Sequence, residues 1–166
     1  KDDVNRSRFY SENIKREKEK STFKNYNEFL ISLKMTSEIN EFKNEFLERI
    51  TQLINKTNQF NLTTKRYTSS EVESISDSQE YISLYANLTD KFGENGLVSV
   101  LIGKLDNDIC TVDTWLMSCR VLKRELEFEV FNKLVKICNQ KKISKIKGKY
   151  LPTLKNSMVA NIYNDL

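Results

Sequence analysis

The spacing of apolar residues changes near residue 80, and this change most constrains the fold. Before it, apolar residues recur at helical spacing in segments 25–34 and 42–54. After it, they alternate with polar residues over 81–86, 97–102 and 109–118. Alternation with period 2 and turn residues between the segments predict three antiparallel strands in succession.

The remaining elements complete an α+β pattern. A long apolar stripe predicts a helix over 124–140, and a strand over 146–151 follows it. Asn156 can cap a last helix, and Ser69 or Ser70 can cap a short helix over 71–75. The stretch 35–39 is prone to form a strand. A chain of 166 residues fits one ordinary domain with its own core.

Composition excludes several kinds of chemistry. The sequence has no histidine, which removes Ser-His-Asp and Cys-His dyads, histidine bases and histidine-containing zinc sites. Its three cysteines are odd in number and have no CxxC spacing, so we expect no metal site and a reducing, cytoplasmic setting. No apolar run approaches a membrane span of about 20 residues, so no membrane partner is expected.

Charge is unevenly distributed along the chain. Residues 1–24 are highly charged and poor in apolar residues, which predicts a linker or a solvated helix from a missing N-terminal domain. The main domain then covers residues 25–166. Residues 133–155 contain eight lysines and no acidic residue, a pattern that attracts an acidic partner or is simply a solvated face. No nucleic-acid motif accompanies the lysines, so nucleic acid is not expected.

Four sequence blocks resemble the C-terminal domain of FkbH-like proteins. They are LINKTNQFNLTTKRYT (53–68), DKFGENGLV (90–98), DTWLMSCRVL (113–122) and YLPTLKN (150–156), in the family's order. The resemblance implies a GNAT-like acyltransferase fold: a central mixed sheet flanked by helices, here without the last two strands. It also implies a haloacid-dehalogenase-like domain N-terminal to this one as an intramolecular partner.

The resemblance implies a function in acyl transfer. FkbH-like proteins load a glyceryl unit onto the phosphopantetheine thiol of an acyl carrier protein, which is the expected partner. An alternative is a non-catalytic module that docks the carrier protein and holds its arm. A weaker alternative is an N-acyltransferase that uses acyl-coenzyme A.

The resemblance places a pantetheine arm in a wedge beside the strand over 109–118. The arm would pair with backbone near Leu116–Cys119, and the start of the following helix would face phosphate. The glycines usual in the GNAT phosphate loop are replaced by Lys123 and Glu125. We therefore expect no tightly bound cofactor, with a carrier-bound phosphopantetheine, or coenzyme A, as the visiting group. The residues implied in arm binding are Trp115, Ser118, Arg120, Lys123 and Arg124.

Two residues are candidates for catalysis. Cys119 is either a nucleophile favoured by nearby basic residues or a small residue packed under the helix. Asp113 shares a predicted strand face with Trp115 and is either a general base or an anchor for a loop.

The segment 55–64 is the densest run of uncharged hydrogen-bonding side chains. Such groups suit a hydroxylated acyl unit or the amides of pantetheine, but they also satisfy the backbone of a buried loop. The candidate acyl-binding residues of this run are Asn55, Asn58, Gln59, Asn61 and Thr63.

Overall fold

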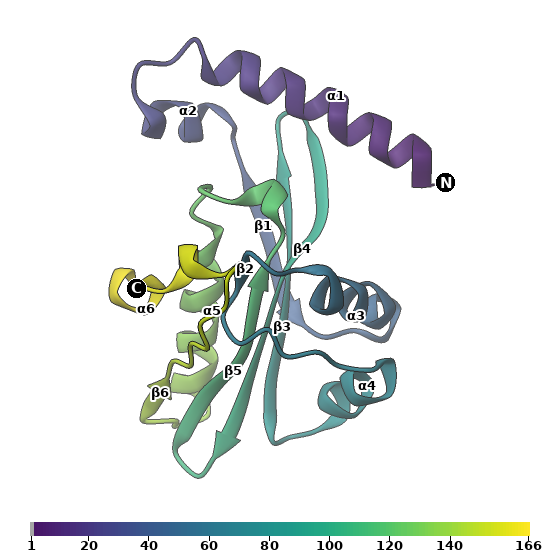
Figure 1. The fold of residues 1–166 in the computed structure, drawn as a ribbon. Helices are drawn as coiled ribbons and strands as arrows, with labels where there is room; N and C mark the ends of the chain where they lie inside the picture. Colours follow the sequence, from purple (N-terminus) through teal and green to yellow (C-terminus); the bar gives the residue numbers. More distant parts are fainter. Residues whose placement is uncertain (1) are drawn as a thin grey trace.

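The computed structural model describes residues 2–166, with side chains from Ser7 onward, and its centre is a mixed sheet of six strands. The strands are β1 (Thr36–Glu41), β2 (Phe60–Asn61), β3 (Tyr81–Asp90), β4 (Gly93–Asp106), β5 (Ile109–Met117) and β6 (Lys145–Lys147). Their order is β1-β3-β4-β5-β2, and β6 also pairs with β5 (Figure 1). All pairings are antiparallel except that of β6 with β5.

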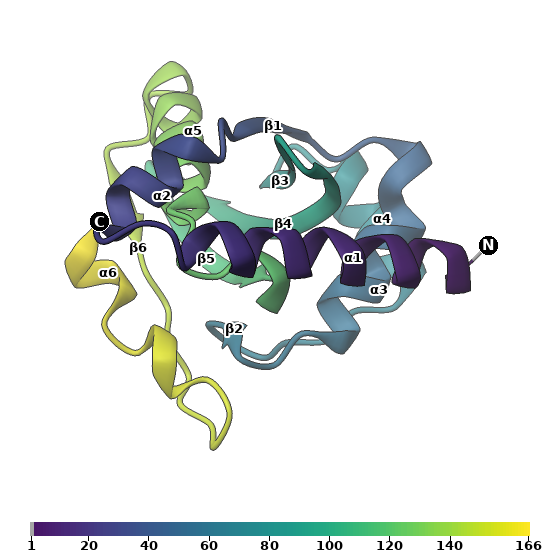
Figure 2. The same ribbon diagram turned by 90° about the horizontal axis from the view of Figure 1, so that it is seen from above.

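Helices cover both faces of the sheet. They are α1 (Asp2–Lys20), α2 (Tyr26–Ser32), α3 (Leu47–Lys56), α4 (Ser69–Asp77), α5 (Leu126–Gln140) and α6 (Ile162–Asp165). Helix α5 lies on one face, α3 and α4 lie on the other, and α1 crosses the end of the sheet (Figures 1 and 2). Within the described residues, no helix is long and apolar enough to span a membrane. The expected α+β fold, with a mixed sheet flanked by helices, is confirmed.

Each face of the sheet carries its own core. On the α5 face, Trp115 and Met117 of β5 pack with Val130 and Leu134 of α5. On the other face, Leu116 packs with apolar residues of α3 and α4. The opposite assignments of Leu116 and its neighbours follow from the alternation of side chains along a strand.

Several element boundaries differ from those expected. Thr68, rather than Ser69 or Ser70, caps α4, because its hydroxyl and the Glu71 carboxylate satisfy each other's backbone N–H groups. Strand β3 extends to Asp90 and β4 begins at Gly93, so the turn between them is residues 91–92 and not the whole segment between the expected strands 81–86 and 97–102. Strand β6 is only three residues long. The Asn156 side chain makes no cap; it bonds to backbone elsewhere.

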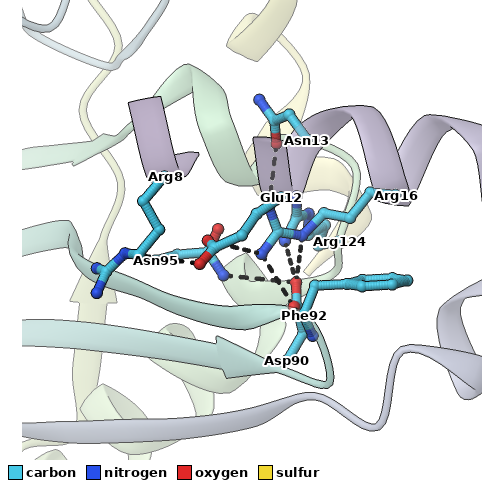
Figure 3. Close-up of polar contacts among 8 residues, drawn as sticks. All are labelled: Arg8, Glu12, Asn13, Arg16, Asp90, Phe92, Asn95 and Arg124. Carbon is cyan, nitrogen blue, oxygen red and sulfur yellow. Dashed lines mark hydrogen bonds and ion pairs between the residues drawn. The ribbon is translucent and has the colours of Figure 1, made fainter. Parts of the chain in front are cut away.

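The highly charged first segment is helix α1, and it is packed against the domain. Glu12 and Arg16 are buried on its inner side. Arg16 forms an ion pair with Asp90 at the end of β3, and Arg124, from the loop before α5, bonds to the same carboxylate (Figure 3). Buried charges of this kind need close partners. Helix α1 therefore does not lead away from the domain as a solvated linker.

Candidate functional site

Strand β5 ends in a tight turn that presents Cys119 at the surface. Ser118 N–H donates to the Val98 carbonyl at 2.7 Å, which keeps the residue after β5 beside β4. The Ser118 hydroxyl accepts hydrogen bonds from Arg120 N and Nε at 3.4 and 3.2 Å. The Val121 side chain is fully buried in the core on the α5 face and so fixes the turn to the domain. The Cys119 thiol is exposed.

A cavity of about 790 Å³ opens beside this turn. We call it the cationic cavity; it lies between the end of β5, helix α3 with the loop after it, and a C-terminal segment. Its lining residues are Arg49, Gln52, Leu53, Lys56, Thr57, Asn58, Gln59, Met117, Ser118, Cys119, Arg120, Leu154 and Lys155. A volume of this size can hold a small organic ligand.

The electrostatics of the cationic cavity favour an anion. Its lining has four basic side chains and no carboxylate: Arg49, Lys56, Arg120 and Lys155. Among the residues that the structure describes, none of the four forms an ion pair. Burial and the nearby charge of Arg49 lower the pKa of the Arg120 guanidinium below its ordinary value. A bound anion would relieve this repulsion.

Cys119 is the accessible thiol of the chain. Cys110 and Cys138 are buried in the α5-side core. Burial raises the pKa of the Cys110 thiol to about 12, and burial also raises the pKa of Cys138. Thiolate chemistry at these two positions is therefore disfavoured, whereas Cys119 faces the cavity.

The structure divides the polar run 55–64 into two groups. Asn58 and Gln59 line the cationic cavity. The other three candidates hold the loop in place. Asn55 Nδ2 donates to the Tyr67 carbonyl at 2.8 Å, and Thr63 Oγ1 donates to the Asp113 carbonyl at 2.8 Å. Asn61 is fully buried. Its Nδ2 donates to the Thr57 carbonyl, and its Oδ1 accepts a hydrogen bond from Thr64 N–H.

Asp113 and Trp115 do not share a face, contrary to expectation. Asp113 is the extra residue of a β-bulge, because Val112 pairs with Gly103 and Thr114 with the adjacent Ile102. The bulge interrupts the alternation of side chains. The Asp113 carboxylate accepts from Lys65 Nζ at 2.7 Å and from Tyr67 OH at 2.6 Å, and it does not line the cavity.

Trp115 belongs to the core and not to a binding surface. It is fully buried on the α5 side, where its ring is near Phe60, Phe131 and Tyr163. The expected contact of Trp115 with an acyl or pantetheine group is therefore wrong for this conformation. Its large apolar area contributes to stability.

The three basic residues after Cys119 have different surroundings. Arg120 lines the cationic cavity, and its guanidinium also lies 4.7 Å from the centre of the Phe9 ring in α1. Arg124 is held by Asp90 at 2.9 Å, so its charge is not free for phosphate. Lys123 is exposed and lines a second cavity, next to α1.

Sequence reasoning missed the contribution of helix α3. Arg49, Gln52 and Lys56 follow one another at spacings of three and four, so they share the polar side of a helix whose other side is apolar. That pattern was the available signal. The contributions of Leu154 and Lys155 have no comparable local signal, because they depend on the path of the C-terminal segment.

The place where β5 and β6 diverge is filled by the chain itself; we call it the β5 slot. Phe60 pairs with Met117 and Asn61 with Leu116, so β2 continues the sheet along this part of β5. Leu62 N–H donates to the Trp115 carbonyl at 3.0 Å, and Leu151 N–H donates to the Leu62 carbonyl at 2.8 Å. On the far side of the slot, Asn156 Nδ2 donates a hydrogen bond to the Asn61 carbonyl at 2.8 Å. The backbone of Leu116 is thus already paired.

The loop before α5 has an unusual backbone. Lys123 and Glu125 both have φ of 63°, a left-handed conformation that glycine adopts far more readily. Glu127, in the first turn of α5, has a buried Oε2 without a hydrogen-bond partner, and burial raises the pKa of its carboxyl group. An anion at this helix start would meet the Glu125 and Glu127 side chains.

The fold is that of the GNAT acetyltransferases. No protein-family model matches the chain, and no curated protein matches it. Ribosomal-protein-alanine N-acetyltransferase from Brucella melitensis is similar in structure, with a TM-score of 0.62 and 13% identity, over 79% of this chain and 91% of that one. The Escherichia coli ribosomal-protein-S18-alanine N-acetyltransferase has a TM-score of 0.59 and 11% identity, over 78% of this chain and 76% of that one.

A third similar structure contains coenzyme A. It is the PaiA N-acetyltransferase of Thermoplasma acidophilum in complex with coenzyme A, with a TM-score of 0.53 and 14% identity, over 78% of this chain and 87% of that one. At these identities the similarity establishes the fold alone.

The residues of this chain do not fit coenzyme A in the expected wedge. An arm along Leu116–Cys119 would meet β2, which already pairs with Leu116 and Met117, and Leu62, which donates to the Trp115 carbonyl. The diphosphate would meet Glu125 and Glu127 at the start of α5 instead of bare backbone.

Proposed function

We propose that this domain takes part in transferring a glyceryl-type acyl unit to the phosphopantetheine arm of an acyl carrier protein. The observation that carries the proposal is the exposed Cys119 thiol in a cavity with four unpaired cations and no carboxylate. The four blocks resembling FkbH-like proteins support it. The blocks 53–68, 113–122 and 150–156 meet around the β5 slot and the cationic cavity. The block 90–98 supplies Asp90, which binds Arg16 of α1.

The cavity suits an acyl phosphate as donor. Its phosphate would sit against Arg49 and Arg120, whose charges lack partners. The Cys119 thiolate attacks the acyl carbon, a carbon–sulfur bond forms, and the carbon–oxygen bond to phosphate breaks. The electron pair leaves with inorganic phosphate, which takes up the thiol proton. The product is a thioester on Cys119, and no histidine is required.

Uncharged donors and acceptors in the cavity suit the hydroxyl groups of a glyceryl unit. Gln52, Asn58 and Gln59 supply amides along one wall. The Asn58 Oδ1 accepts a hydrogen bond from Arg66, which orients this amide.

The carrier protein would be attracted by the lysines around β6. Lys145 and Lys147 are exposed, and Lys149 follows them. We expect the affinity for the carrier to fall as salt rises, because exposed charges are screened within about 8–10 Å at physiological ionic strength. Charge reversal at Lys145, Lys147 and Lys149 should weaken binding, and an affinity indifferent to both changes would remove this part of the proposal.

The decisive experiment measures acyl transfer by intact-mass spectrometry. A phosphopantetheinylated carrier protein is incubated with the acyl phosphate and the full-length protein that contains this domain. We expect loading with the unmodified protein, none with Cys119→Ser, and a raised donor KM with Arg120→Gln. Glu73→Gln, at an exposed position of α4 outside the cavity lining, is the matched control. Full loading by Cys119→Ser would overturn the role of the thiol.

Two other functions have an observation each in their favour. The filled β5 slot favours a non-catalytic module that docks the carrier protein and presents its arm to another domain. That function requires the cationic cavity but not the thiol, so Cys119→Ser would leave it intact. The similar structures are N-acetyltransferases, which favours acyl transfer to an amine. Acyl-coenzyme A would then have to bind outside the β5 slot, and calorimetry with acetyl-coenzyme A tests this directly.

A further inference from the structure

Cys119 and Arg120 separate two cavities. One side of the turn faces the cationic cavity, and the other side faces a second cavity of about 520 Å³. We call the second one the α1 groove, because helix α1 forms one of its walls; α2 and the loop 119–124 form the others. Both cavities include Cys119 and Arg120 in their lining. The thiol is therefore reachable from two directions.

The walls of the α1 groove are held in place by buried charges. Arg16 of α1 and Arg124 of the loop both line the groove, and both bond to the fully buried carboxylate of Asp90 (Figure 3). Tyr26 OH donates to the Lys123 carbonyl at 2.6 Å, which ties α2 to the same loop. The groove therefore exists before any ligand binds, which lowers the entropic cost of binding.

The chemistry of the groove is apolar and amide-bearing with basic residues beside it. Tyr10 and Ile14 of α1 line it and are 72% and 54% exposed, so a ligand in the groove can cover their apolar surface. Asn13 supplies an amide on the same helix. Lys20 and Lys123 add positive charge, opposed by the single carboxylate of Glu17.

This lining fits a slender, neutral chain that contains amides and ends in a phosphate. A pantetheine arm has these properties: a thiol at one end, two amides and a branched apolar part in the middle, and a phosphodiester at the other end. Lys20 and Lys123 can bind the phosphodiester, and Asn13 can bond to the amides. Tyr10 and Ile14 can contact the branched apolar part. The β5 slot cannot take this chain, because Phe60, Asn61 and Leu62 fill it.

We propose that the acceptor arm reaches Cys119 through the α1 groove, opposite the acyl donor in the cationic cavity. This inference rests on the proposed function. The arm's thiol attacks the acyl carbon of the Cys119 thioester, and a new carbon–sulfur bond forms as the bond to Cys119 breaks. The Cys119 sulfur leaves with the electron pair and takes up the proton lost by the arm's thiol. The two substrates thus never compete for one entrance.

The test uses the reaction of Cys119 with pantethine, the symmetrical disulfide of pantetheine. Exchange leaves a pantetheine unit on Cys119 and releases the other, which intact-mass spectrometry follows over time. Bis(2-hydroxyethyl) disulfide measures the intrinsic reactivity of the thiol without the arm. Cys119→Ser must abolish both reactions, because Cys110 and Cys138 are buried.

Filling the groove should slow pantethine alone. Ile14→Trp places a large ring in the groove from an exposed position of α1. We expect it to reduce the pantethine rate about tenfold, the effect of about 1.4 kcal/mol of lost binding, and to leave the hydroxyethyl disulfide rate within about twofold. Ile31→Trp is the matched control, since Ile31 is 77% exposed on α2 and lines neither cavity.

Two outcomes would overturn the inference. One is an unchanged pantethine rate in Ile14→Trp. The other is a pantethine rate that falls only in Gln52→Trp, which fills the cationic cavity and would make that cavity the arm's entrance. Neither outcome bears on whether Cys119 accepts an acyl group, which is decided separately by the loading assay with Cys119→Ser.

Discussion

Arg16 and Asp90 lie 74 positions apart in the sequence and meet in a buried two-point ion pair. Arg16 Nε donates to Asp90 Oδ2 at 2.7 Å and Nη2 donates to Oδ1 at 2.9 Å. Their side chains are 4% and 0% exposed. Arg124 and the Phe92 N–H share the same carboxylate. This arrangement fixes α1 to the end of the sheet and builds the α1 groove.

Replacing Asp90 by Asn should destabilise the domain by about 3–5 kcal/mol, because it leaves two buried guanidinium groups without a counter-charge. Urea unfolding followed by circular dichroism measures the change. Glu17→Gln, which removes an exposed pair with Lys20, is the control and should cost less than about 1 kcal/mol. Equal effects in the two variants would mean that the Asp90 cluster contributes no more than a surface pair.

The same cluster predicts an acid dependence of stability. Burial alone would raise the pKa of Asp90, but the bonds from Arg16 and Phe92 and the charges of both arginines hold it below the ordinary 3.8. Protons therefore bind the unfolded chain first as the pH falls. The contribution of Asp90 is complete well above pH 3.8 and is lost as the pH falls through the lowered pKa. In Asp90→Asn, this part of the pH dependence of the unfolding free energy should disappear.

Asn61 and Asn58 should respond oppositely to alanine. Asn61→Ala removes two buried hydrogen bonds to the loop backbone and should cost about 1–3 kcal/mol of stability. Asn58→Ala changes the lining of the cationic cavity and should reduce carrier loading with a small change in unfolding free energy. Thermal unfolding and the mass-spectrometric loading assay, run on both variants, separate these effects. A stable Asn61→Ala variant with lost loading would return Asn61 to the binding site.

Asp113→Asn should affect stability and leave the reactivity of Cys119 unchanged. The carboxylate accepts from Lys65 and Tyr67, and an amide in its place loses the charge that these donors match. Because Lys65 is half exposed, we expect a cost of about 1 kcal/mol. The rate of Cys119 with bis(2-hydroxyethyl) disulfide reports on the thiol. A rate that falls by tenfold or more would restore Asp113 as a base.

Local patterns predicted the elements of this fold well. The change of apolar spacing near residue 80 placed β3, β4, β5 and α5, because periodicity depends only on which face of an element is buried. The order of these elements along the chain predicted the α+β layer arrangement. Boundaries were less accurate where a side chain decides them, as at Thr68.

The site was predicted only in part, because its composition depends on contacts between distant segments. Alternation along β5 could not reveal the bulge at Asp113, which is set by the pairing with β4. Nothing in segment 55–64 distinguishes Asn58, which lines the cavity, from Asn61, which is buried. The position of α1 depends on Asp90, which follows Arg16 by 74 positions in the sequence.

Lys123→Gly with Glu125→Gly should stabilise the loop and still give no coenzyme A binding. Both residues have φ of 63°, where glycine avoids a steric cost of about 1–2 kcal/mol that is partly offset by its greater freedom when unfolded. The double variant should not gain coenzyme A binding, because the β5 slot remains filled by Phe60–Leu62. Calorimetry with acetyl-coenzyme A should show no micromolar binding in either protein, and tight binding by the double variant would show that the slot can open.

The filled β5 slot also has a consequence for mass action. A protein that completes its sheet with a bound ligand gains stability in proportion to the logarithm of ligand concentration. Here the completing strand is Phe60–Asn61, which is covalently part of the chain and present at a fixed effective concentration. Completion of the sheet in this domain should therefore need no ligand, and its contribution to stability should not depend on the concentration of coenzyme A.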